Sequence, residues 1–140
     1  MLYADTSFLV SLYVWDTHSL AARELMKPSP RVWFTPFHFT ECFHAIAQQV
    51  FLGKIHRDQA EAAYKDLNHD LAAGLWAEVA VPEQVFTVSA DLARRHGPKL
   101  GVRTLDSLHV ACALELKAER FWTFDERQAK LARAEGLKTS

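Results

Sequence analysis

The chain has 140 residues, which suits one compact domain and is too short for two comfortable ones. Hydrophobic residues make up 49% of it, with four Trp and nine Phe, which supplies a real core and argues against disorder. The formal net charge of −1 excludes a globally basic surface for nucleic acid, so any such contact must come from local patches or from metal ions.

The cysteines and the apolar runs bear on the compartment. Cys42 and Cys112 lie in apolar, helix-like contexts and form no CxxC pair, so we interpret them as buried thiols in a reducing compartment. The N-terminus has no basic segment, and Asp5 and Asp16 interrupt its first apolar stretch, which argues against a signal peptide. No run of about 18 apolar residues exists, so we expect a soluble, cytoplasmic protein.

The first half of the chain is expected to alternate between strands and helices. An apolar run ends at Asp5, and the following Thr6 and Ser7 are good residues to begin a helix. Farther on, two helices are expected to form a hairpin, the first ending at Gly53. The expected elements are a strand at 2–4, helices at 8–15 and 18–26, a strand at 32–35, and helices at 37–52 and 57–71.

The second half continues the alternation. Gly97, Pro98 and Gly101 indicate a loop, and Gly136 is suited to end the last helix. The expected elements are a strand at 76–81, a helix at 85–93, a loop at 96–102, a helix at 105–116, a strand at 121–124, a helix at 126–134 and a last short strand at 137–139. This order predicts an α/β fold, a three-layer sandwich with a mainly parallel central sheet, as a single domain spanning residues 1–140.

Four acidic residues are predicted to reach one edge of this sheet. Asp5 and Asp125 each follow an apolar strand directly, and ligands of parallel sheets bind outside the carboxyl ends of the strands. Glu41 lies near the start of the helix that follows the second strand, and Asp106 lies in the first turn of the helix at 105–116. Taken singly, each has a plainer interpretation: Asp5 and Asp106 as helix caps, Glu41 as a solvated helix residue, and Asp125 as the start of a turn.

Taken together, these acids favour a metal site. Two carboxylates about 4 Å apart repel by roughly 4 kcal/mol at an effective dielectric constant of about 20, so several cannot all stay ionised without a cation. A site made only of oxygen ligands prefers a hard ion, so Mg²⁺ or Mn²⁺ is the expected cofactor.

The same acids occur in motifs of a known family. The sequence resembles the PIN domain and, within it, the VapC-type ribonuclease toxins of toxin–antitoxin pairs. The matching segments are ADTSFLV at 4–10, FTE at 39–41, LDSLHVA at 105–111, and TFDER at 123–127, followed by Ala132 and by Gly136 and Leu137. Their order and spacing extend over nearly the whole chain.

The resemblance implies the activity and the site. It implies a Mg²⁺- or Mn²⁺-dependent endoribonuclease that hydrolyses RNA phosphodiester bonds, leaving 5′-phosphate and 3′-hydroxyl ends. It further implies a homodimer and an antitoxin protein that blocks the site. The catalytic and metal-binding residues it implies are Asp5, Glu41, Asp106 and Asp125, with the hydroxyls of Thr6 and Thr123 orienting them.

The chain departs from the family pattern in small ways. Cys42 and Phe43, after the glutamate, are bulkier than expected, and Glu126 adds an acid without an assigned role. His109 lies one turn after Asp106 on the same helix face, so it either packs in the core or contacts substrate or the fourth carboxylate, and His38 and His44 are interpreted in the same way as packed histidines. No HxH or HExxH spacing suggests zinc.

A cluster of basic residues with no acid among them comes just before Asp106. It has two interpretations, a solvated loop or a rim that guides phosphates into the acidic site. The stretch 58–91, with seven acids against one lysine, is expected to face away from nucleic acid. We call the cluster the basic segment, and its members are Arg94, Arg95, Lys99 and Arg103.

Two other functions remain open. Another Mg²⁺-dependent phosphate-ester hydrolase, such as a phosphatase with an aspartyl nucleophile, would require a second Asp two residues beyond Asp5, where Ser7 stands. A binding module with the PIN fold but without chemistry is the other alternative, and the presence of all four acids argues against it.

Overall fold

The computed structural model describes residues 1–139, which divide into two compact units. The terminal unit contains residues 1–5 and 80–139, and the central unit contains residues 6–79. Among the described helices, none is long and apolar enough to cross a membrane.

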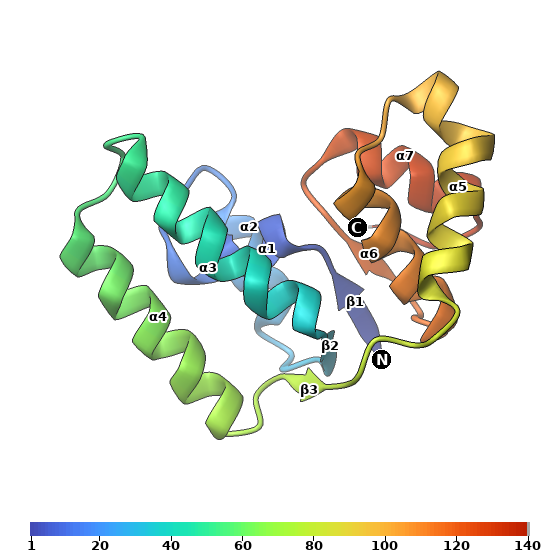
Figure 1. The fold of residues 1–140 in the computed structure, drawn as a ribbon. Coiled ribbons are helices and arrows are strands. Elements are labelled where there is room, and N and C mark those ends of the chain that lie inside the picture. Colours follow the sequence, from blue (N-terminus) through green and yellow to red (C-terminus); the bar gives the residue numbers. More distant parts are fainter. Residues whose placement is uncertain (140) are drawn as a thin grey trace. The chain divides into compact units, whose positions relative to one another are not determined.

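The terminal unit pairs the first strand of the chain with the last one (Figure 1). β1 and β4 are parallel, with Tyr3 opposite Phe121 and Ala4 opposite Trp122. Thr139 adds only an isolated parallel bridge to Phe121, in place of the short strand expected at 137–139. The elements of this unit are β1 (Leu2–Ala4), α5 (Val85–Leu100), α6 (Thr104–Glu115), β4 (Phe121–Trp122) and α7 (Glu126–Ala134).

Helix α6 lies at the core of the terminal unit, where it packs against α5 and α7. Every residue from Asp106 to Ala113 is buried, on all sides of the helix. Small side chains such as Ala111 and Ala113 allow this, because they let neighbouring helices approach closely. The polar residues of α6 are therefore held in fixed positions.

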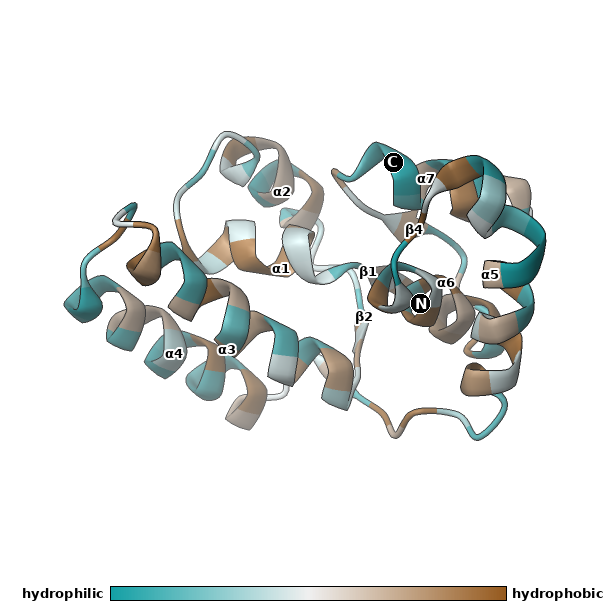
Figure 2. Ribbon diagram, turned by 45° about the horizontal axis from the view of Figure 1, so that its top comes forward, coloured by the Kyte–Doolittle hydropathy of each residue, from teal (hydrophilic) through white to brown (hydrophobic). Residues whose placement is uncertain are grey.

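The central unit holds four helices and a second pair of parallel strands, with Trp33 opposite Ala77. Helices α3 and α4 run side by side as the expected hairpin (Figure 1), and the ring of Tyr64 stacks on Phe43 with centroids 4.5 Å apart. Figure 2 shows hydrophilic and hydrophobic residues alternating along α4, whose buried stripe includes Leu67. The elements are α1 (Thr6–Tyr13), α2 (Ser19–Met26), β2 (Val32–Phe34), α3 (Pro36–Phe51), α4 (Arg57–Ala72) and β3 (Ala77–Glu78).

Both strand pairs are parallel and alternate with helices, which confirms the predicted α/β class with parallel strands. Three strands are shorter than expected: β2 ends at Phe34, β3 includes only Ala77 and Glu78, and β4 ends at Trp122. The indole Nε1 of Trp76 donates to the Tyr13 hydroxyl at 2.7 Å, and that hydroxyl donates to Asp70 Oδ2 at 2.7 Å. Burial and the bond to Asp70 raise the pKa of Tyr13 well above its usual value.

The loop expected at 96–102 is wrong, because α5 continues to Leu100. Pro98 removes only one helix hydrogen bond near the end of the helix, and packing of α5 against α6 and α7 offsets that loss. Arg95 and His96 also hold Glu135 beyond α7, each at 2.6 Å. The helix ends at Gly101, whose positive φ of 61° suits a residue without Cβ.

The thiols and histidines are mostly as expected. Cys42 and Cys112 are buried cysteines outside any disulfide, and burial raises the pKa of the Cys112 thiol to about 11. His38 is buried, and His109 is buried with its Nδ1 2.8 Å from the Tyr3 hydroxyl. His44 is instead exposed, because it lies on the outer face of α3, so that prediction is wrong.

Candidate functional site

Asp5 is a buried carboxylate at the carboxyl end of β1, with 1% of its surface exposed. Its backbone N–H donates to Trp122 O at 2.9 Å, which extends the pairing of β1 with β4 by one step. Its Oδ2 accepts hydrogen bonds from Thr123 Oγ1 at 2.7 Å and from Gln128 Nε2 at 3.1 Å. The pairing of β1 with β4 therefore brings Thr123 and Gln128 to the Asp5 carboxylate, although they lie 118 and 123 positions farther along the sequence.

The Thr123 hydroxyl links Asp5 to Asp125. While its proton is donated to Asp5, its oxygen accepts from the backbone N–H of Asp125 at 2.9 Å. Asp125 is the N-cap of α7, where its Oδ1 accepts from the backbone N–H groups of Arg127 at 2.8 Å and Gln128 at 3.2 Å. The capping role that the sequence allowed for Asp125 is thus present, and its Oδ2 has no hydrogen bond to any described residue.

Gln128 is the residue of this network that sequence reasoning missed. It lies in the first turn of α7, three residues after Asp125, and only 6% of it is exposed. Its amide oxygen Oε1 is buried and has no hydrogen-bond partner among the described residues. A Gln three residues after an N-cap Asp is a recognised pattern at helix starts, and that signal could have drawn attention to it.

Asp106 lies in the first turn of α6 and is 3% exposed. Its Oδ2 accepts from the backbone N–H of Arg103 at 2.9 Å and from Arg103 Nε at 3.4 Å, so Asp106 also caps its helix. Its Oδ1 makes no hydrogen bond within residues 1–139. The structure thus holds one carboxylate oxygen of Asp106 by the helix start and leaves the other without such a bond.

Glu41 belongs to the central unit, where it lies half-buried in α3. Its Oε1 accepts from Thr6 Oγ1 at 3.0 Å. Both threonines singled out from the sequence therefore donate to an acid of the predicted set, Thr6 to Glu41 and Thr123 to Asp5.

The side chains of the terminal unit have the chemistry that a hard cation requires. Asp5, Asp106, Asp125 and Gln128 offer oxygen only, and the orphaned Gln128 Oε1 is a buried acceptor beside a buried carboxylate. Among residues 1–139, however, no three His, Cys, Asp or Glu side chains stand together so as to hold a metal ion. The donor set fits the predicted ion, while the metal site itself stays a prediction.

The basic segment is largely paired with acids. Arg94 and Arg95 contact Asp91 at 3.0 and 2.7 Å, and Arg95 also contacts Glu135 at 2.6 Å. These arginines hold the pKa of both acids below their usual range. Arg103 donates to Asp106 through its backbone N–H and through its side chain. Lys99 is exposed and forms no ion pair in the described part of the chain.

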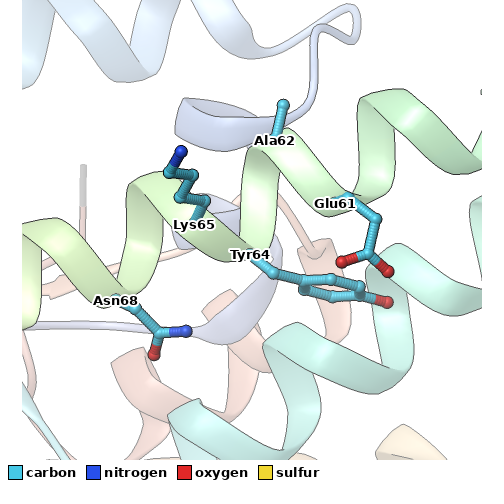
Figure 3. Close-up of a pocket in the computed structure, with 5 residues that line it drawn as sticks. All are labelled: Glu61, Ala62, Tyr64, Lys65 and Asn68. Carbon is cyan, nitrogen blue, oxygen red and sulfur yellow. The ribbon is translucent and has the colours of Figure 1, made fainter.

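Two further features lie apart from the network. Glu126, the extra acid of the sequence, contacts Arg133 at 2.8 Å across an exposed face of α7. A surface hollow over α4 of the central unit contains none of the predicted site residues (Figure 3). It is lined by Glu61, Ala62, Tyr64, Lys65 and Asn68.

Comparison with protein families identifies the family of this chain. The family model described as the PIN domain matches residues 2–134, nearly the whole chain. The chain belongs to the PIN-domain family. The parallel strands that alternate with helices match the α/β fold of this family. No curated protein matches the chain significantly.

Solved structures of similar fold come from several bacteria. The VapC20 toxin of Mycobacterium tuberculosis, described as cleaving the sarcin-ricin loop, is 16% identical with a TM-score of 0.73, over 98% of this chain and 96% of its own. FitAcB from Neisseria gonorrhoeae is 14% identical with a TM-score of 0.71, over 99% and 96%. VapBC2 from Rickettsia felis, bound to a promoter DNA fragment, is 14% identical with a TM-score of 0.65, over 100% and 98%. At these identities the likeness establishes the fold.

Proposed function

We propose that residues 1–140 form one nuclease domain, a Mg²⁺- or Mn²⁺-dependent endoribonuclease that is the toxin of a toxin–antitoxin pair. Membership of the PIN family supports a nuclease. The proteins of similar fold include a toxin that cleaves the sarcin-ricin loop and a toxin–antitoxin complex from Klebsiella pneumoniae, which supports the more specific assignment.

The observation that carries the proposal is the state of Asp5. A carboxylate that is 1% exposed is costly to bury, and Thr123 and Gln128 hold Asp5 in a fixed orientation at the end of β1. Coordination of a metal ion is one way in which proteins keep a buried charge, and we propose it for this carboxylate.

The chain's own residues then have distinct tasks. We assign Asp5, Glu41, Asp106 and Asp125 as the groups that hold the ion, with Thr123 and Thr6 fixing the orientation of Asp5 and Glu41. A bound Mg²⁺ or Mn²⁺ would neutralise these carboxylates, polarise the phosphodiester and make water a better nucleophile at neutral pH. The helix starts at Arg103 and Asp125 hold one oxygen of Asp106 and of Asp125, so that the other oxygen of each is available.

RNA capture is assigned to the basic segment. Arg94, Arg95 and Lys99 lie on the last turns of α5, and Arg103 follows that helix directly. Because Arg94 and Arg95 are already paired with Asp91, and Arg103 with Asp106, Lys99 is the side chain best able to contact phosphate. Exposed pairs of this kind contribute little to stability, so RNA phosphates can compete for them.

The remaining parts of the proposal concern partners and place. An antitoxin that covers the site and a homodimer are proposed from the family resemblance. A cytoplasmic location is proposed from the two buried cysteines, which are thiols rather than halves of a disulfide.

The test is incubation of the purified protein with RNA, with Mn²⁺ and with EDTA, followed by sequencing of the RNA ends. We expect cleavage with Mn²⁺, none with EDTA, and 5′-phosphate and 3′-hydroxyl products. RNA that is bound but stays intact would favour a binding module. Hydrolysis of a small phosphate ester with RNA left intact would favour the other hydrolase.

A further inference from the structure

Gln128 is the one buried amide in contact with the carboxylate network of the terminal unit. Its Nε2 donates to Asp5 at 3.1 Å, and its backbone N–H donates to Asp125 at 3.2 Å. One residue thus touches two of the proposed metal-binding carboxylates, one through its side chain and one through its backbone.

The orientation of this amide follows from charge. A carboxylate oxygen accepts hydrogen bonds and repels another oxygen, so the NH₂ group of Gln128 must face Asp5. Nε2 and Oε1 share one amide carbon, so Oε1 belongs to the same amide group that contacts Asp5 and is turned away from the carboxylate oxygen. Oε1 is buried and has no partner among residues 1–139, although leaving a buried acceptor unsatisfied costs about 1–3 kcal/mol.

We infer that Gln128 is a further positioning residue of the metal site: its Nε2 clamps Asp5, and its Oε1 accepts a hydrogen bond from the hydration shell of the bound cation. Mg²⁺ gives up its water ligands reluctantly and keeps several of them in proteins. An amide acceptor beside Asp5, one of the proposed metal ligands, therefore suits a hydrated ion. Partners of this kind typically affect metal affinity about 10- to 100-fold. The inference rests on the proposed metal-dependent function.

Three variants of the full chain test it, with Mn²⁺ alone as the probe. Gln128→Met removes both amide atoms at similar length, and Gln128→Glu keeps an oxygen at Oε1 but places a second carboxylate against Asp5. Ser107→Ala is the matched control, because Ser107 Oγ is also a buried oxygen without a partner but makes no bond to Asp5. Isothermal titration measures the Mn²⁺ dissociation constant, and thermal unfolding measures stability with and without Mn²⁺.

We expect Gln128→Met to weaken Mn²⁺ binding about 10- to 100-fold, and Ser107→Ala to leave it unchanged. Gln128→Glu should unfold at a lower temperature than wild type without metal, and Mn²⁺ should raise its melting temperature by more than it raises that of wild type. This sign is specific, because a cation relieves the repulsion between the introduced carboxylate and Asp5. If Gln128 had only a structural role, the substitution would lower the melting temperature and Mn²⁺ would not restore it.

Each result has one meaning. Unchanged Mn²⁺ affinity in Gln128→Met, or no enlarged Mn²⁺ effect in Gln128→Glu, would overturn the inference and leave the metal-dependent nuclease standing. If the wild-type protein itself binds no Mn²⁺, the proposed function and the inference fall together.

Discussion

The Thr123 hydroxyl joins the two strand-end aspartates of the terminal unit, so its removal should cost stability. Thr123→Val keeps the shape of the side chain but loses the bond to Asp5 at 2.7 Å and the bond from the Asp125 N–H at 2.9 Å. A hydrogen bond to a charged group contributes about 1.5–3 kcal/mol and a neutral one about 0.5–1.5 kcal/mol. The free energy of unfolding should therefore fall by about 2–4.5 kcal/mol.

Urea unfolding followed by circular dichroism measures this loss. Domains of this size are stable by about 5–15 kcal/mol, so the variant should remain folded, with an unchanged dependence on urea concentration. Thr87→Val is the matched control, because Thr87 is exposed on α5 and makes no side-chain hydrogen bond to any described residue. It should change stability by less than about 0.5 kcal/mol. A loss in Thr123→Val below about 1 kcal/mol, or equal to the control, would refute the reasoning.

Four further predictions concern the site and its surroundings. Asp5→Asn should abolish Mn²⁺-dependent RNA cleavage with an unchanged circular dichroism spectrum, and cleavage at the wild-type rate would show that the site is misassigned. Millimolar Mn²⁺ should raise the melting temperature of wild type, since an ion that binds only the folded state stabilises it. The double variant Asp5→Asn and Asp106→Asn should show no such rise. An unchanged melting temperature of wild type would contradict a preformed site. Changing the basic segment to Gln should reduce the slope of log affinity against log salt by about 0.7 for each lost contact to single-stranded RNA, and equal slopes would leave RNA capture unexplained. Arg95 and His96 lower the pKa of Glu135 in the folded state. The stabilisation by ionised Glu135 is therefore complete above its pKa in the unfolded chain, about 4.3, and is lost as the pH falls through its lower pKa in the folded protein. Urea unfolding should accordingly show Glu135→Gln less stable than wild type at pH 7, with a smaller difference at pH 3, and a difference independent of pH would exclude this linkage.

Sequence alone determined the order of the elements and the positions of the acids along them. Helix α7 begins and ends where the pattern predicted, at Glu126 and Ala134, because its signals are local: an N-cap Asp before it and Gly136, with φ of 84°, after it. The placement of Asp5 and Asp125 directly after apolar strands is local in the same sense. Such features depend on neighbours within one turn or one strand, which a sequence displays directly.

Tertiary structure decided what depends on partners far along the chain. Gly97 and Pro98 indicate a loop when read locally, but α5 passes through them because packing on α6 and α7 and the contacts to Glu135, about 40 residues away, stabilise the helix. The sequence shows Gln128 only as part of a helix-start pattern, and the pairing of β1 with β4 brings Asp5 to it from 123 positions away. Hydrogen bonds across such separations form only once the strands have paired, so no local pattern could have shown that its amide oxygen would be buried without a partner.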